Sequence, residues 1–276
     1  MPKSADELLL RDLDEGVLTL TMNNPKRLNG WTMEMMDAIK AAFIDAAVDD
    51  DVDVVILTGT GKYYCAGVNL GATLKLDHPK KLHGMIVEHN QALFDAFLDF
   101  PKPILVAANG PAIGASVTSA TLCDGVIAAE GATFSTPFAS LGIVPEGCSS
   151  VHFARIMGEA NAERMLGHEG WKPTAQQAKD AGLIQWATTE ADLMTEAKKI
   201  ARGWIAEGAT RTYRGGSTKA ELKEVNALES VALADAFLAA PFMKAQFQFL
   251  LSKKKHGPAA MFGAMLVTRP LWSKLL

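Results

Sequence analysis

The chain has 276 residues, of which 49% are hydrophobic and 21% are charged, and its formal net charge is −4 at pH 7. This composition excludes a disordered chain, because so apolar a chain of this length can bury a large core. The acidic balance argues against a dedicated nucleic-acid binder, whose surface carries an excess of Lys and Arg. The three cysteines are too few for a disulfide framework, which favours a reducing, intracellular setting.

Strands alternate with helices in the predicted elements of the first half. Strands rich in Val, Ile and Leu are predicted over 17–22, 52–57, 104–108 and 126–129. Apolar residues at helical spacing predict helices over 32–48 and 79–98, and a third one that starts near Gly114. Such an alternation indicates parallel strand pairing with right-handed crossovers, and therefore an α/β fold.

Helical patterns dominate the second half. Thr-x-x-Gln at 174–177 and Thr-x-x-Glu at 218–221 both fit the capping box, which predicts a helix start at each. The segment 191–255 is almost wholly helical in pattern. We therefore expect a core over residues 1–195 that carries the site, and a helical section over 196–276.

Several familiar motifs are incomplete. Gly59–Lys62 resembles the end of a phosphate loop, but Ile56 and Tyr63 occupy positions where that loop needs Gly and Ser or Thr. The segment around Ser116 lacks the closing Gly of a nucleophile elbow, which leaves a serine hydrolase with little support. The six histidines show no metal-ligand spacing, so no metal site is predicted.

No targeting or membrane segment is expected. Acidic residues interrupt the N-terminus, where a signal peptide needs an unbroken apolar run. The longest apolar stretch, 104–129, contains Asn, Gly, Pro and Asp and does not predict a membrane span. We expect a cytoplasmic protein. A peroxisomal location is the alternative, because Ser273–Leu275 spells a peroxisomal address, although Leu276 follows it.

Two loops that contain glycine each follow a predicted strand. They cover 64–70 and 109–116, and the second opens a helix of small residues. Small residues let a ligand approach the backbone closely, and a helix N-terminus offers free N–H donors. The two loops could thus hold a developing oxyanion together, with tight turns required only for packing as the alternative.

A third loop, 141–150, carries one carboxylate. Glu146 lies between Pro145 and Gly147 and follows Ile143 and Val144. Apolar neighbours are expected to remove water from this carboxyl group, which raises its pKa toward the range useful for proton abstraction. A turn glutamate that faces solvent is the alternative.

Taken together, the three loops resemble the crotonase family, also called the enoyl-CoA hydratase/isomerase superfamily, over residues 8–255. The resemblance implies a ββα spiral core with a helical C-terminal oligomerisation section. It implies an acyl-CoA thioester substrate, a homotrimer or dimer of trimers, and neither a nucleic-acid nor a membrane partner. No cofactor is implied, because CoA is part of the substrate.

Site residues follow from the same resemblance. The segment 24–29 resembles the early loop that meets the CoA end, which implies binding by Lys26, Arg27 and Leu28, with a solvated surface as the alternative for Lys26. The segment 65–70 resembles the first oxyanion loop, which implies the Val68 N–H as one donor and ligand contacts by Cys65, Ala66, Gly67 and Asn69. The segment 109–115 resembles the second oxyanion loop, which implies the Ala115 N–H as the other donor, next to Gly114.

Departures from the family pattern indicate the activity. Hydratases of the family carry two glutamates that activate water, and this chain has Thr118 and Phe138 at those positions. Glu146, in Leu-Gly-x-x-Pro-Glu-Gly-Cys-Ser-Ser, matches the single catalytic glutamate of peroxisomal-type Δ3,Δ2-enoyl-CoA isomerases. The resemblance therefore implies an isomerase of fatty-acid β-oxidation that converts 3-enoyl-CoA to 2-trans-enoyl-CoA. An acyl-CoA hydrolase, a ring-substrate isomerase, a dehalogenase and a non-catalytic CoA-binding protein remain alternatives.

Overall fold

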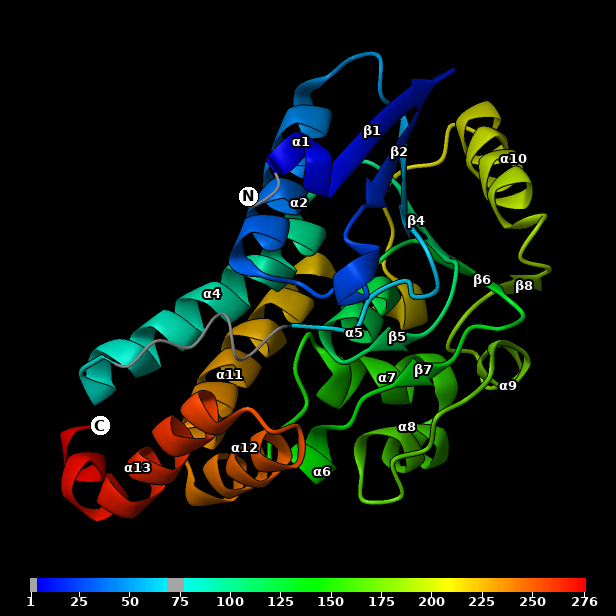
Figure 1. The fold of residues 1–276 in the computed structure, drawn as a ribbon. Coiled ribbons are helices and arrows are strands. Elements are labelled where there is room, and N and C mark those ends of the chain that lie inside the picture. The colour runs from blue at the N-terminus through cyan, green and yellow to red at the C-terminus, as the bar shows by residue number, and fades with distance from the viewer. Residues whose placement is uncertain (1–3, 69–76) are drawn as a thin grey trace.

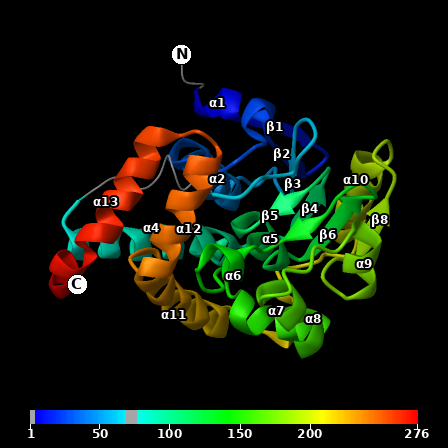
Figure 2. The same cartoon turned by 60° about the horizontal axis from the view of Figure 1, so that its bottom comes forward.

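A computed structural model describes residues 4–68 and 77–276. Among these residues, six strands form one sheet in the order β1-β2-β3-β4-β6-β8 (Figures 1 and 2). Strand β1 pairs antiparallel with β2, and every later neighbour pairs in parallel. The strands are β1 (Leu9–Asp14), β2 (Val17–Met22), β3 (Val54–Gly59), β4 (Ile104–Ala108), β6 (Gly125–Ala129) and β8 (Trp186–Thr188). The parallel pairing expected from the alternating pattern is confirmed.

Sequence patterns missed the two edge strands and a small second sheet. Strand β1, with the sequence LLRDLD, mixes apolar and charged residues on each face, and both Leu10 and Leu13 are more than two-fifths accessible. Strand β8 has only three residues, and the second sheet joins two two-residue strands, β5 (Ala112–Ile113) and β7 (Phe134–Ser135). Such short pairings carry too few residues for a periodic pattern.

The central strands are apolar on both faces because helices cover both. Helix α10 (Leu193–Ala206) packs on one face, where Ala197 lies in a cluster with Ile56 and Leu105. Residues that alternate with these, such as Leu57 and Val106, belong to the larger core on the other face. A parallel sheet buried in this way has near-continuous apolar strands, as observed. Helix α10 runs across residues 195–196, the expected boundary between core and helical section, and packs on the sheet.

The helices expected over 32–48 and 79–98, near Gly114 and after Thr174 begin close to those positions, whereas the helices over 5–8, 138–141, 149–157 and 159–166 were not predicted. In the first half the helical elements are α1 (Ala5–Leu8), the 3-10 turn η1 (Pro25–Arg27), α2 (Met33–Val48), α4 (Pro79–Asp99) and α5 (Ala115–Thr121). They are followed by α6 (Phe138–Leu141), α7 (Ser149–Met157), α8 (Glu159–Leu166) and α9 (Ala175–Asp180). The capping box that begins α9 is confirmed in both of its hydrogen bonds. At 218–221, only the bond from the Glu221 N–H to the Thr218 hydroxyl is present.

The C-terminal section consists of helices that pack beside α4 (Figures 1 and 2). After the 3-10 turn η2 (Arg214–Gly216) come α11 (Lys219–Phe237), α12 (Ala240–Ser252), α13 (His256–Trp272) and η3 (Ser273–Leu275). Helix α11 lies along α4, and their side chains share a second apolar cluster with α12 and α13. Within the described residues no single helix is long and apolar enough to cross a membrane; α11 and α12 pass that test only jointly, as a pair bent by 63°.

Candidate active site

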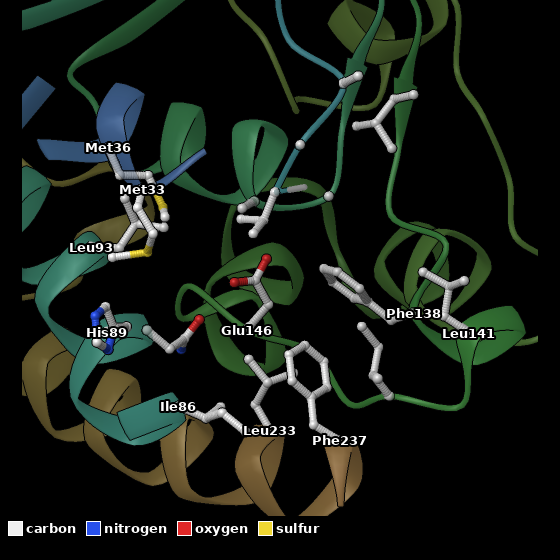
Figure 3. A pocket seen from close by; sticks show the side chains of 18 of the residues that line it. Met33, Met36, Ile86, His89, Leu93, Phe138, Leu141, Glu146, Leu233 and Phe237 are labelled. Carbon is white, nitrogen blue, oxygen red and sulfur yellow. The ribbon is translucent and has the colours of Figure 1, made fainter. Parts of the chain in front are cut away.

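A cavity of about 400 Å³ lies between the loops that follow strands β3 and β4 and the helices α4 and α11 (Figure 3). One wall consists of backbone from the two oxyanion-type loops, around Val68 and Ala115. The opposite wall is apolar and comes from α4, α11 and the α6 region: Leu82, Ile86, Leu93, Phe138, Leu141, Ile143, Leu233 and Phe237. The carboxylate of Glu146 points into the space between these walls. The cavity thus combines a polar backbone wall, one buried acid and an apolar surface.

Hydrogen bonds hold the two loops against each other. The Ile113 N–H donates to the Cys65 carbonyl oxygen at 3.0 Å, and the Cys65 N–H donates to the Pro111 carbonyl oxygen at 3.3 Å. The buried Ser116 hydroxyl reaches across and donates to the same Cys65 carbonyl at 3.1 Å. A Cβ placed on Gly67 would lie 2.5 Å from the Ile113 carbonyl oxygen, so the loops approach as closely as glycine allows.

Val68 and Ala115, one on each of these loops, line the cavity. Within the described part of the chain, no acceptor receives the N–H of Val68 or that of Ala115. Ala115 is the first residue of α5, where N–H groups lack intrahelical acceptors, and Gly114 before it has φ +59°. Unpaired donors on adjacent loops are the arrangement that stabilises an oxyanion.

Glu146 is buried in the cavity wall, with 5% of its surface exposed. Its carboxylate accepts one hydrogen bond, from the Thr118 hydroxyl at 3.3 Å. Burial, and after it the negative charge of Glu229, raise the pKa of Glu146 to about 8, against the opposing effect of the Thr118 hydrogen bond. A carboxyl group with a pKa in this range can both take and return a proton near neutral pH. The desolvation expected from its apolar neighbours is confirmed.

The turn that carries Glu146 has an unusual backbone. Gly147 and Cys148 both have φ of 65°, in the left-handed region. The Ser149 hydroxyl donates to the Glu146 carbonyl oxygen at 2.7 Å, and α7 begins at that serine. Glu229 on α11 accepts the Cys148 N–H at 2.6 Å. Glu146 is therefore fixed just before a helix start, on a turn held from another helix.

The predicted CoA-binding residues lie in different surroundings. Lys26, Arg27 and Leu28 are exposed on η1 and after it, outside the lining of the cavity. The Leu28 carbonyl accepts the Ala66 N–H at 3.0 Å, which joins this early loop to the first oxyanion-type loop. Cys65 is buried behind the cavity wall, whereas Ala66, Gly67 and Gly114 line it. Asn69 lies outside the described residues.

Sequence reasoning missed the contributions of α4 and α11 to the site. Asn90 on α4 lines the cavity and donates to the Ser230 hydroxyl on α11 at 3.0 Å. Leu233 and Phe237 line it from α11. Helical spacing marks such residues as facing inward, but the same spacing describes an ordinary core face. Within the described residues, no group of three or more His, Cys, Asp or Glu side chains is placed to hold a metal ion.

Comparison with known proteins identifies the family of the chain. A family model described as enoyl-CoA hydratase/isomerase matches residues 12–247. Human enoyl-CoA delta isomerase 2 is 36% identical over 260 residues, which cover 90% of this chain and 64% of the human protein. Peroxisomal enoyl-CoA delta isomerase 3 of Mus musculus is 32% identical over 252 residues, which cover 88% and 78% of the two chains.

Solved structures extend the comparison to the fold. The crystal structure of an enoyl-CoA hydratase/isomerase from Pseudoalteromonas atlantica superposes with a TM-score of 0.74 at 27% identity, covering 90% of this chain and 97% of the other. The expected spiral α/β core with a helical C-terminal region is thereby confirmed. The chain belongs to the enoyl-CoA hydratase/isomerase family.

Proposed function

We propose that the chain is a Δ3,Δ2-enoyl-CoA isomerase that moves the double bond of a 3-enoyl-CoA to give the 2-trans-enoyl-CoA. The observation that carries this proposal is one cavity that holds a buried carboxylate, Glu146, and the N–H groups of Val68 and Ala115, which have no acceptor within the described residues. A 1,3 proton shift consumes no water and transfers no electrons to a partner. A single acid-base group and a stabilised oxyanion therefore suffice for it.

In the proposed reaction, the thioester carbonyl oxygen accepts hydrogen bonds from the N–H groups of Val68 and Ala115. The Glu146 carboxylate removes a proton from C2, and the electron pair of that C–H bond moves toward the thioester oxygen. The resulting dienolate is stabilised by the two donors. Glu146 then returns its proton to C4, and the double bond forms between C2 and C3. No cofactor takes part, because CoA belongs to the substrate.

The two ends of the substrate would meet different parts of the cavity. The apolar side chains of α4 and α11, such as Ile86 and Phe237, offer a surface for the acyl chain. At the other end, Lys26 and Arg27 lie exposed on the loop that hydrogen-bonds to Ala66. We propose that their positive charges meet the phosphates of CoA, to which fixed cations are complementary.

The C-terminal helices offer apolar surface for assembly of the chain. Helices α11, α12 and α13 expose large apolar side chains, including Leu228, Phe249 and Val267. Buried between subunits, these would support a homotrimer or a dimer of trimers. A cytoplasmic location, with a peroxisomal one as the alternative, stays a prediction.

A panel of acyl-CoA esters tests the proposed reaction. The purified protein is incubated with 3-enoyl-, 2-enoyl- and saturated acyl-CoA esters, and the products are analysed by mass spectrometry and absorbance of the conjugated thioester. We expect 3-enoyl-CoA to be converted at unchanged mass with a gain of conjugation. A gain of one water would indicate a hydratase, and release of free CoA thiol a hydrolase; either result without isomerisation contradicts the proposal.

The pH dependence of kcat/KM should report the ionisation of Glu146. Because the carboxylate form is the base and its pKa is raised to about 8, activity should increase with pH and level off above that value. We expect roughly a tenfold rise per pH unit between pH 6 and pH 7.5. Initial rates at low substrate concentration, measured in buffers of constant ionic strength, check this. A flat profile over that interval would mean that the active base is already ionised at pH 6.

A further inference from the structure

Helix α11 carries a buried carboxylate on the face that it turns toward the cavity. Glu229, Leu233 and Phe237 are spaced four residues apart and share one face of the helix. Leu233 and Phe237 line the cavity, and Glu229 is only 6% exposed. Glutamate is almost never buried to this extent unless its charge is paired or hydrogen-bonded. The hydrogen-bond partners of Glu229 therefore indicate its role.

Both oxygens of Glu229 accept N–H groups from the start of α7. One oxygen accepts the Cys148 N–H at 2.6 Å and the other accepts the Ser150 N–H at 2.8 Å. Helix α7 has no side-chain cap of its own, because its N-cap residue, Cys148, makes no capping hydrogen bond. Glu229 thus supplies from another helix the acceptors that a local cap would provide, and its charge complements the helix N-terminus.

The turn held in this way is the one that carries Glu146. Its next two residues, Gly147 and Cys148, both adopt φ of 65°, a conformation that is unfavourable for cysteine. The Cys148 thiol also contacts α11, where it donates to the Leu222 carbonyl oxygen at 3.1 Å. A Cβ on Gly147 would lie 2.6 Å from the Thr118 hydroxyl oxygen, so the turn also packs closely against α5. Small displacements of this turn would move the Glu146 carboxylate.

Among the charged groups near the turn, Glu229 is the one that acts most strongly on the pKa of Glu146. Among the described residues that line the cavity there is no Lys or Arg, and the titratable ones besides Glu146 are Glu34 and His89. On α4, Asp95 accepts a hydrogen bond from Asn226 and lies 3.5 Å from the Lys223 ammonium.

On the remaining side of the turn, α7 contributes one titratable ring. Burial lowers the pKa of His152 to about 4, so this ring is neutral, and it hydrogen-bonds the Thr121 carbonyl oxygen. Burial also raises the pKa of Glu229, while the hydrogen bonds from Ser150 and Cys148 act in the opposite direction. Two N–H donors on its two oxygens favour the ionised form.

We propose that Glu229 is a positioning residue for the isomerisation: it fixes the turn that presents Glu146 to the substrate and keeps a negative charge beside it. This inference rests on the proposed function. Glu229 does not touch the substrate. It acts through Glu146, whose placement and basicity it controls.

The variant Glu229→Gln tests this role. Its amide oxygen can accept one of the two N–H groups, while the amide nitrogen faces the other as a second donor. We expect kcat to fall by roughly ten- to a hundredfold with KM within about threefold, because the base is displaced while the binding surface remains. The inflection in kcat/KM should move to lower pH, since the like charge beside Glu146 is gone.

Two further variants complete the experiment. Glu224→Gln makes the same chemical change on an exposed position of the same helix, and it should match the wild type in every measurement. Glu229→Asp keeps the charge and both acceptors on a shorter side chain. It should keep the inflection of the wild type while its kcat lies between those of the wild type and E229Q. Circular dichroism and thermal unfolding establish which variants fold.

The outcomes separate this inference from the proposed function. If the wild type and E224Q do not isomerise 3-enoyl-CoA, the proposed function fails, and the inference fails with it. If both isomerise it and folded E229Q equals them in kcat, only the role of Glu229 is overturned. A lower kcat with an unmoved inflection in E229Q also overturns it, because that result fits a purely structural carboxylate. Should E229Q not fold, E229D decides alone: a kcat equal to that of the wild type, or a displaced inflection, overturns the inference.

Discussion

Glu146→Gln should lower kcat for 3-enoyl-CoA isomerisation by roughly 10²–10⁴-fold, the range expected for removal of a general base. The amide has nearly the shape of the carboxylate but cannot accept the C2 proton. The donors at Val68 and Ala115 belong to other loops, so KM should change little. Initial rates from the absorbance of the conjugated thioester provide the measurement. Activity within a few-fold of the wild type would contradict the assignment of Glu146 as the base.

Thermal unfolding of Glu146→Gln distinguishes the loss of the catalytic base from misfolding of the variant. The pKa of Glu146 is raised from 4.5 to about 8 in the folded protein, so over this interval the folded state holds a proton that the unfolded state releases. The associated stability is present below pH 4.5 and is lost as the pH rises through 8. A neutral amide avoids this loss. Glu146→Gln should therefore unfold at the same or a higher temperature than the wild type at pH 8 to 9.

A second carboxylate provides a control inside the cavity. Glu34 on α2 also lines it, but its side chain is exposed, and a hydrogen bond with the Thr32 side chain lowers its pKa. A carboxyl group that is a weak base in this way is a poor proton acceptor. We expect Glu34→Gln to reduce kcat by less than about tenfold, in contrast to Glu146→Gln. A larger loss in E34Q than in E146Q would assign the base to α2.

Short-range patterns placed the loops after their strands, and the family resemblance then marked these loops as a candidate site. The strands that end before the two oxyanion-type loops, β3 and β4, are apolar runs bounded by Gly and Asn, and such boundaries are local signals. Glu146 could be identified because it is an isolated carboxylate between Pro145 and Gly147. Its burial, its hydroxyl partner Thr118 and the direction of its pKa shift then came from the fold.

Long-range contacts could not be predicted in the same way. Glu229 is 83 positions beyond Glu146 in the sequence and looks like any glutamate on a charged helix. Only the packing of α11 against α4 and α7 shows that it is buried. The apolar wall of the cavity has the same origin, since Leu233 and Phe237 follow a spacing that also suits a packed core. Edge strand β8 was missed because three residues show no period.

Gly67→Ala should impair catalysis without touching the base. Gly67 has φ +78°, and a Cβ there would lie 2.5 Å from the Ile113 carbonyl oxygen, closer than real contacts permit. The two oxyanion-type loops would have to separate, which displaces the Val68 N–H relative to that of Ala115. A misplacement of about 1 Å costs on the order of 10²-fold in rate, so we expect kcat/KM to fall by about that factor. The positive φ adds a loss of stability of about 1 kcal/mol or more.

A control variant and the pH profile of Gly67→Ala test the cause of this loss. Gly84→Ala makes the same change inside α4, where an added Cβ meets no heavy atom within 4 Å, and should be neutral or stabilising by up to about 1 kcal/mol. In Gly67→Ala the inflection of kcat/KM should remain near pH 8, because the surroundings of Glu146 are unchanged. A folded G67A protein with kcat/KM within about fivefold of the wild type would show that the spacing of the two loops does not control the rate. A loss of rate at an unmoved inflection would instead separate the oxyanion donors from the base as independent parts of the site.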